Sequence, residues 1–86
     1  MERNLGKKKR LLIYQVVKGT FSHPDIGHYT SYGIKILRVS HGKLHELKTV
    51  SDVSTNEALV KQLATLCTRG QLSPIHLMDV IEDFIG

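Results

Sequence analysis

The chain has 86 residues, of which 41% are hydrophobic and 23% charged, and it contains one cysteine. This length allows one hydrophobic core, and the composition argues against a disordered or a fibrous protein. No apolar stretch approaches the roughly 20 residues that cross a bilayer, and one cysteine excludes an internal disulfide. We therefore expect a cytoplasmic protein with no membrane segment.

The net charge of +4 is concentrated at the start of the chain. Residues 1–10 contain five Lys or Arg and one Glu, whereas the rest of the chain contains seven basic and seven acidic residues. A charge run of this kind at a terminus is typical of a solvated arm. The sequence therefore predicts a flexible basic arm over residues 1–9 and a single domain over residues 10–86.

Three segments have the β-branched and aromatic composition of strands, and they span residues 10–18, 29–39 and 44–50. Between the first two, residues 19–28 collect Gly, Pro, Asp and Ser, which predicts a loop. Between the last two, His41-Gly42 predicts a tight hairpin turn, because glycine adopts positive φ freely and histidine tolerates it. The second and third strands should therefore pair antiparallel.

Two helices should follow the strands. Ser54 and Glu57 have the spacing of a capping box at the start of the first helix, and Gly70 is expected to end it as a left-handed residue. Ser73, followed by Pro74 in the first turn, predicts the start of the second helix. Two helices joined by so short a link should form a helical hairpin.

These elements predict an α+β fold in which a three-stranded antiparallel sheet is followed by a C-terminal helical hairpin packed on one sheet face. The first strand is apolar on both faces, so the helices should leave apolar surface uncovered. We expect a partner to bind there and at the acidic side of the second helix. The residues of this expected interface are Leu12, Tyr14, Val16, Leu37, Val39, Asp79, Glu82 and Asp83.

No motif in the sequence indicates catalysis or metal binding. His23, Asp25 and His28 share the predicted loop and include zinc-binding residue types, but no second ligand cluster accompanies them, so we interpret them as turn residues. Cys67 falls on the apolar stripe of the first helix and is interpreted as a small hydrophobic residue. Signatures of nucleophilic enzymes, metalloproteases and phosphate-binding loops are all missing from the sequence. We therefore expect a protein without catalytic residues, metal or cofactor.

Three segments resemble a known family: QLSPIHLMDVIEDFI at residues 71–85, YGI at 32–34 and DVST at 52–55. They are similar to landmarks of a family of small proteins from clostridial and related Gram-positive bacteria, catalogued as a domain of unknown function. The resemblance spans residues 29–86 and excludes the basic arm. It implies a bacterial cytoplasmic protein and supplies no activity, ligand or functional residue.

Two hypotheses for the function remain. The leading one is a non-enzymatic bacterial protein–protein interaction or regulatory module, self-associating or binding another protein, that buries the open sheet face or an edge strand. The alternative is a small nucleic-acid-binding accessory protein in which Lys7, Lys8, Lys9 and Arg10 neutralise phosphates. The neutral charge of the rest of the chain and its acidic second helix favour the first hypothesis.

Overall fold

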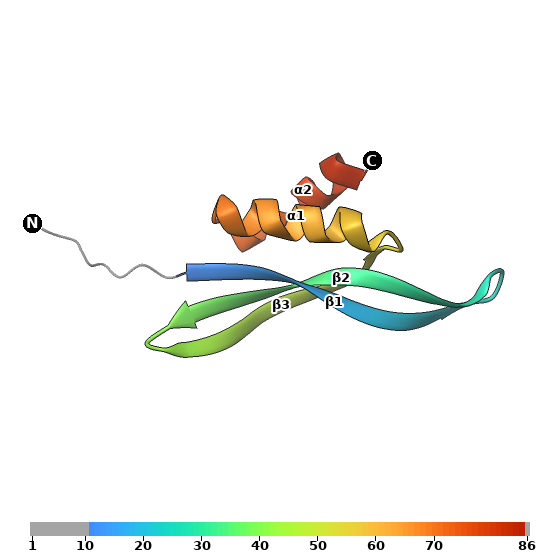
Figure 1. Ribbon diagram of the computed structural model, residues 1–86, viewed down its shortest axis with the longest axis horizontal. Helices are drawn as coiled ribbons and strands as arrows, with labels where there is room; N and C mark the ends of the chain where they lie inside the picture. Colours follow the sequence, from blue (N-terminus) through green and yellow to red (C-terminus); the bar gives the residue numbers. More distant parts are fainter. Residues whose placement is uncertain (1–10, 86) are drawn as a thin grey trace, which may run out of the picture.

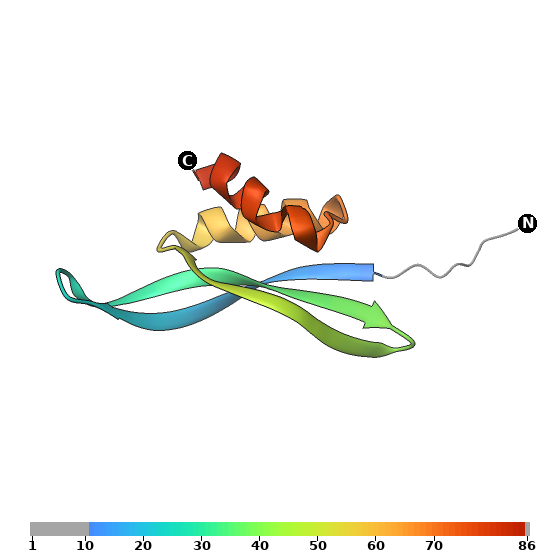
Figure 2. The same cartoon turned by 180° about the vertical axis from the view of Figure 1, so that it is seen from behind.

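The computed structural model describes residues 11–85, so the predicted basic arm, with Lys7, Lys8, Lys9 and Arg10, lies outside the described residues. The elements are β1 (Leu11–His23), β2 (Gly27–Ser40), β3 (Lys43–Ser54), α1 (Glu57–Arg69), the short 3-10 helix η2 (Pro74–His76) and α2 (Leu77–Ile85). The strands form one antiparallel sheet in the order β1-β2-β3, and both α-helices lie on the same face of it (Figure 1). In both views the helices lie above the sheet, and among the described residues no helix lies on the face below it (Figure 2). These features confirm the predicted fold class.

The first hairpin is longer than the sequence predicts. Pairing of β1 with β2 runs from Leu11 opposite Val39 to His23 opposite Gly27, so the predicted loop over residues 19–28 is wrong. Only residues 24–26 form the turn. Gly19 remains inside β1 because the ring of Phe21 lies against it, at the place where an added Cβ would come within 2.9 Å of the ring. The ring supplies the packing that a glycine in a strand lacks.

The second hairpin has the predicted turn. His41 and Gly42 have φ angles of 53° and 75°, and they join β2 to β3 as the only two residues between the strands. Two consecutive positive φ angles are the mark of a type I′ turn, whose twist matches that of the paired strands. The prediction from the His-Gly dipeptide is confirmed.

Both ends of α1 differ from the prediction. Asn56 is the N-cap, and its side-chain oxygen accepts a hydrogen bond from the Leu59 N–H at 3.2 Å. Ser54 still belongs to β3, and its hydroxyl accepts from the Asn56 N–H at 3.0 Å, so the predicted capping box is wrong. At the other end Gly70 has φ −84°, and the following residue, Gln71, is left-handed with φ 50°. The side chain of Gln71 explains this difference, as shown below.

The start of the second helical segment is as predicted. Ser73 is the cap residue and Pro74 occupies the first turn of η2, which runs directly into α2. Proline suits this position because the first N–H groups of a helix have no partner within the helix.

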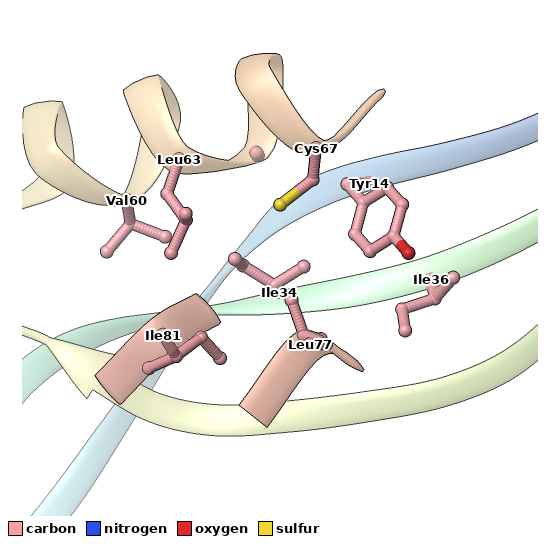
Figure 3. Close-up of a cluster of buried hydrophobic side chains, with 9 residues drawn as sticks. Tyr14, Ile34, Ile36, Val60, Leu63, Cys67, Leu77 and Ile81 are labelled. Atoms are coloured by element: carbon pink, nitrogen blue, oxygen red, sulfur yellow. The ribbon is translucent and has the colours of Figure 1, made fainter. Parts of the chain in front are cut away.

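The hydrophobic core lies between the helices and the sheet. β1 contributes Tyr14, and Cys67 of α1 lies close to it with its sulfur directed into the core (Figure 3). Residues from β1, β2, α1 and α2 form this core, namely Tyr14, Ile34, Ile36, Val60, Leu63, Ala64, Cys67, Leu77 and Ile81. The helices therefore contribute more than half of the buried side chains.

The helices are shorter than the sheet that they cover. The 13 residues of α1 span about 20 Å, whereas the 13 residues of β1 span about 43 Å. Both hairpin ends consequently extend beyond the helices (Figure 1). Within residues 11–85, no helix is both long enough and apolar enough to cross a membrane.

Candidate protein-interaction surface

The strand residues of the expected interface are divided between the two faces of the sheet. The register places Tyr14 opposite Ile36 and Val16 opposite Ile34, on the face that the helices cover. Tyr14 is only 4% exposed, and Leu12 and Val16 pack against the same core. The prediction that these three side chains lie on the open face is therefore wrong. Periodicity separates two apolar faces of a strand, but it does not tell which face the helices will cover.

Leu37 and Val39 do lie on the uncovered face. Ile13 is paired with Leu37, and Val39 is flanked by Leu11 on β1 and by Leu44 on β3. Leu11 is 50% exposed and Leu44 is 61% exposed, while the other three side chains are partly buried. We call these five residues, Leu11, Ile13, Leu37, Val39 and Leu44, the open-face cluster. No helix covers it (Figure 2).

A charged pair borders the open-face cluster. Lys35 of β2 and Glu46 of β3 form an ion pair at 3.8 Å, with 33% and 56% of their side chains exposed. Glu46 also accepts a hydrogen bond from the Thr49 hydroxyl at 3.0 Å. The border therefore presents one basic and one acidic group to solvent, next to the apolar side chains.

Side chains cover the edge of β1 at Leu12 and Tyr14, two residues whose backbone N–H and carbonyl groups point away from β2. Thr68 accepts a hydrogen bond from the Tyr14 N–H at 2.8 Å and donates one to the Tyr14 carbonyl at 3.3 Å. The side chain of Gln71 binds Leu12 in the same way, accepting from its N–H at 2.8 Å and donating to its carbonyl at 2.9 Å. These two side chains imitate a neighbouring strand. Strand addition, which the sequence suggested for an edge, is therefore blocked along this part of β1.

Sequence reasoning missed this role of Thr68 and Gln71. Thr68 lies outside the apolar stripe of α1 and Gln71 follows the helix, so neither side chain has a periodic signal in the sequence. The Gln71 side chain also donates to the Thr68 carbonyl at 2.7 Å. This bond and the two bonds to Leu12 hold Gln71 in its left-handed conformation, which the sequence had assigned to Gly70.

The acidic residues of the expected interface lie apart from the open-face cluster. Asp79, Glu82 and Asp83 are exposed on α2, which packs on the opposite side of the sheet (Figure 1). The two halves of the predicted interface therefore do not form one continuous surface.

The histidines of the first hairpin lie in or beside its turn. His23 ends β1, and its ring nitrogen Nδ1 accepts a hydrogen bond from the Asp25 N–H at 3.1 Å. Within the part of the chain that the structure describes, no three His, Cys, Asp or Glu side chains gather in an arrangement that could hold a metal ion. The observed role of His23 is to stabilise a turn.

These features define a small α+β domain with a three-stranded sheet that is covered by helices on one face only. The chain belongs to DUF6514, a family of unknown function, whose sequence profile matches residues 2–86. This match confirms the resemblance to a family catalogued as a domain of unknown function, and it extends over the N-terminal residues that the resemblance left out. No curated protein and no solved structure matches the chain.

Proposed function

We propose that this protein is a non-enzymatic protein–protein interaction module that self-associates through its open-face cluster. The observation that carries the proposal is a set of five aliphatic side chains on a sheet face that no helix covers. Sheets in globular proteins usually bury at least one face, and apolar side chains on a second face favour packing against another layer.

The size of the domain adds to this argument. A chain of 86 residues has a small core, and the helices cover only part of one sheet face. Burying the open-face cluster would add stability at about 25 cal/mol for each Å² of apolar surface removed from water. A second sheet packed about 10 Å away would achieve this burial.

The charged border favours a second copy of the chain as the partner. In an interface with two-fold symmetry each surface meets its own copy, so the surface must be self-complementary. Lys35 and Glu46 provide one charge of each sign beside the cluster, and a two-fold axis can bring each of them toward the opposite charge on the second copy. The closed edge of β1 also favours face-to-face packing over strand addition at that edge.

The proposal places the module in the cytoplasm, which suits a single, buried thiol at Cys67. Nucleic-acid binding by the basic arm remains a prediction, because the residues that would carry it lie outside the described part of the chain.

A pair of matched substitutions tests the proposal. Leu44→Lys places a charge in the open-face cluster, and Ile75→Lys places the same charge at a residue that is 82% exposed in η2, on the helix side. Sedimentation velocity from about 1 µM to about 1 mM should show a dimer for the wild type and for Ile75→Lys. Leu44→Lys should weaken the dimer at least tenfold. A wild-type protein that stays monomeric over the whole range, or equal weakening by both substitutions, would exclude self-association through this face.

A further inference from the structure

A small hollow lies at the other end of the open face, away from the open-face cluster. It has a volume of about 40 Å³ and is lined by Val17, Lys18, Gly19, Phe21, Ser31, Gly33, Ser51 and Asp52. Gly19 is paired with Ser31, and the ring of Phe21 lies against Gly19. At Gly33 the backbone of β3 comes so close that an added Cβ would lie 2.2 Å from the Val50 carbonyl oxygen. Because Gly19 and Gly33 have no side chains, the Phe21 ring and the backbone of β3 can pack around Ser31.

Ser31 supplies a buried polar atom in this hollow. Its side chain is 0% exposed, and its hydroxyl has no hydrogen-bond partner within residues 11–85. Buried hydroxyl groups nearly always have a partner, because leaving one unpaired in the interior is unfavourable. The hydroxyl therefore lies beside the hollow with hydrogen-bonding capacity that the described residues leave unused.

Asp52 supplies a carboxylate at the same place. It lies in an irregular stretch of β3, between the pairs Ile34–Val50 and Tyr32–Ser54, and its left-handed φ of 56° belongs to that irregularity. The Tyr29 hydroxyl donates a hydrogen bond to Asp52 Oδ2 at 2.6 Å. This bond leaves the other carboxylate oxygen, Oδ1, available as an acceptor.

The exposed Asp52 carboxylate is charged, and no Lys, Arg or His within residues 11–85 forms an ion pair with it. The Tyr29 hydrogen bond lowers the pKa of Asp52, and the Ser31 hydroxyl lowers it further although it does not reach hydrogen-bond geometry. Lys18 lines the hollow, but it is paired with Tyr32, so strand alternation assigns its side chain to the helix face, and it forms no ion pair with Asp52. Among the described residues, the negative charge beside the hollow therefore has no ion-pair partner.

Two aromatic rings complete the surroundings. The ring centres of Phe21 and Tyr29 are 5.8 Å apart, with an angle of 34° between the ring planes. Aromatic faces attract cations, and a carboxylate and a hydroxyl accept hydrogen bonds from them.

We propose that this hollow, lined by Phe21, Ser31 and Asp52 with Tyr29 bound to the Asp52 carboxylate, binds a primary ammonium group such as the end of a lysine side chain. An ammonium group donates three hydrogen bonds, and its positive charge would balance the negative charge of the Asp52 carboxylate. Its size also fits, because about 40 Å³ gives room for one ammonium group, and a trimethylammonium group has no N–H to donate. A neutral hydroxyl group would leave the carboxylate charge unbalanced.

This site does not depend on self-association. On β1 the nearest residues of the two sites are Val17 of the hollow and Ile13 of the open-face cluster, which lie four residues apart, or about 13 Å in an extended strand. Ligand binding at the hollow can therefore be measured separately from dimerisation at the open-face cluster, and either inference can fail without the other.

Titration with n-butylammonium, followed by the backbone amide signals of Gly19, Ser31 and Gly33 in NMR spectra, tests the proposal. We expect saturable shifts with butylammonium, and none with 1-butanol or butyltrimethylammonium at the same ionic strength. Asp52→Asn should weaken binding at least tenfold, and asparagine retains the tolerance for left-handed φ. Asp79→Asn removes one exposed carboxylate from α2 and should leave the affinity unchanged.

Further titrations identify the source of the ammonium group. A peptide with the sequence of residues 4–11 of this chain presents three lysines, and tighter binding of this peptide than of butylammonium would indicate a lysine in a polypeptide. Equal or weaker binding of the peptide would indicate a free amine. Absence of saturable shifts with every amine, equal shifts with 1-butanol, or unchanged affinity in a folded Asp52→Asn variant would overturn the proposal. The hollow would then hold only water.

Discussion

At Gly33 the backbone of β3 lies so close to β2 that a side chain has no room. An added Cβ would lie 2.2 Å from the Val50 carbonyl oxygen and 2.9 Å from Ser51 Cα, and both of these are backbone atoms that cannot rotate away. The absence of a side chain, and not a positive φ, is therefore what this position requires. The irregular stretch that carries Asp52 begins directly beside this contact.

Gly33→Ala should consequently lower the free energy of unfolding by at least about 2 kcal/mol, because the strand must shift to admit the methyl group. Gly70→Ala is the matched control, since Gly70 has φ −84° and an added Cβ would meet its nearest neighbour at 3.4 Å. That control should change the free energy of unfolding by less than about 1 kcal/mol. Urea denaturation of both variants measures the difference, and equal effects would show that β3 adapts to a side chain at Gly33.

At the scale of the elements, the edge of β1 is protected by side chains of the helical half. Thr68 and Gln71 satisfy both backbone groups of Tyr14 and of Leu12, at successive outward-facing positions of the strand. Edge strands with unpaired backbone groups promote aggregation, and covering them is one way in which proteins prevent it. α1 and the link that follows it thus cover the hydrophobic core and also satisfy the backbone groups at the edge of β1.

Thr68→Val should remove the contacts to Tyr14 while preserving the shape of the side chain. We expect the free energy of unfolding to fall by about 1–2 kcal/mol and the Tyr14 amide to exchange its hydrogen faster. Thr65→Val is the matched control, because Thr65 lies on the same helix and is exposed. Hydrogen exchange followed by NMR measures the effect at Tyr14. Protection of this amide that remains unchanged in Thr68→Val would mean that the hydrogen bond to Thr68 does not close the edge.

The type and order of the elements were predictable because they depend on local patterns. The His41-Gly42 turn and the Ser73-Pro74 helix start are each set by a dipeptide, and the structure confirms both. The length of β1 was missed because Gly19 is stabilised by Phe21, a contact that composition does not reveal. The face covered by the helices, the role of Gln71 and the position of Asp52 all depend on register between distant segments. Alternation within a single strand carries no information about that register.

At the scale of the whole molecule, Tyr14 connects the sheet to the helical half. Its ring is in the core, and its hydroxyl donates a hydrogen bond to the Leu72 carbonyl in the link between α1 and η2. Burial, with a smaller contribution from the nearby Cys67, raises the pKa of Tyr14 from its usual 10.0 to about 12. The folded protein therefore holds this proton more tightly than the unfolded chain does.

Because the pKa of Tyr14 is higher in the folded protein than in the unfolded chain, the free energy of unfolding should fall as the pH rises above 10. Below pH 10 Tyr14 is neutral in both states, and its contribution to stability is fully present. As the pH rises from about 10 to about 12, the unfolded chain loses the proton first, so the free energy of unfolding should fall by roughly 2–3 kcal/mol. Tyr14→Phe should remove this fall. It should also lower stability at neutral pH by about 1–2 kcal/mol, because the Leu72 carbonyl loses its partner.

Urea denaturation of the wild type and of Tyr14→Phe between pH 8 and pH 12 measures this contribution as the difference between two curves. Cys67, whose pKa is raised by burial, titrates in both proteins and largely cancels in the comparison. Tyr32→Phe is the control, since the Tyr32 hydroxyl makes no hydrogen bond to a side chain or to the backbone within residues 11–85. This control should follow the wild-type curve. If the curves of the wild type and Tyr14→Phe stay parallel up to pH 12, ionisation of Tyr14 does not separate the helical half from the sheet, and the connection between them depends on apolar packing alone.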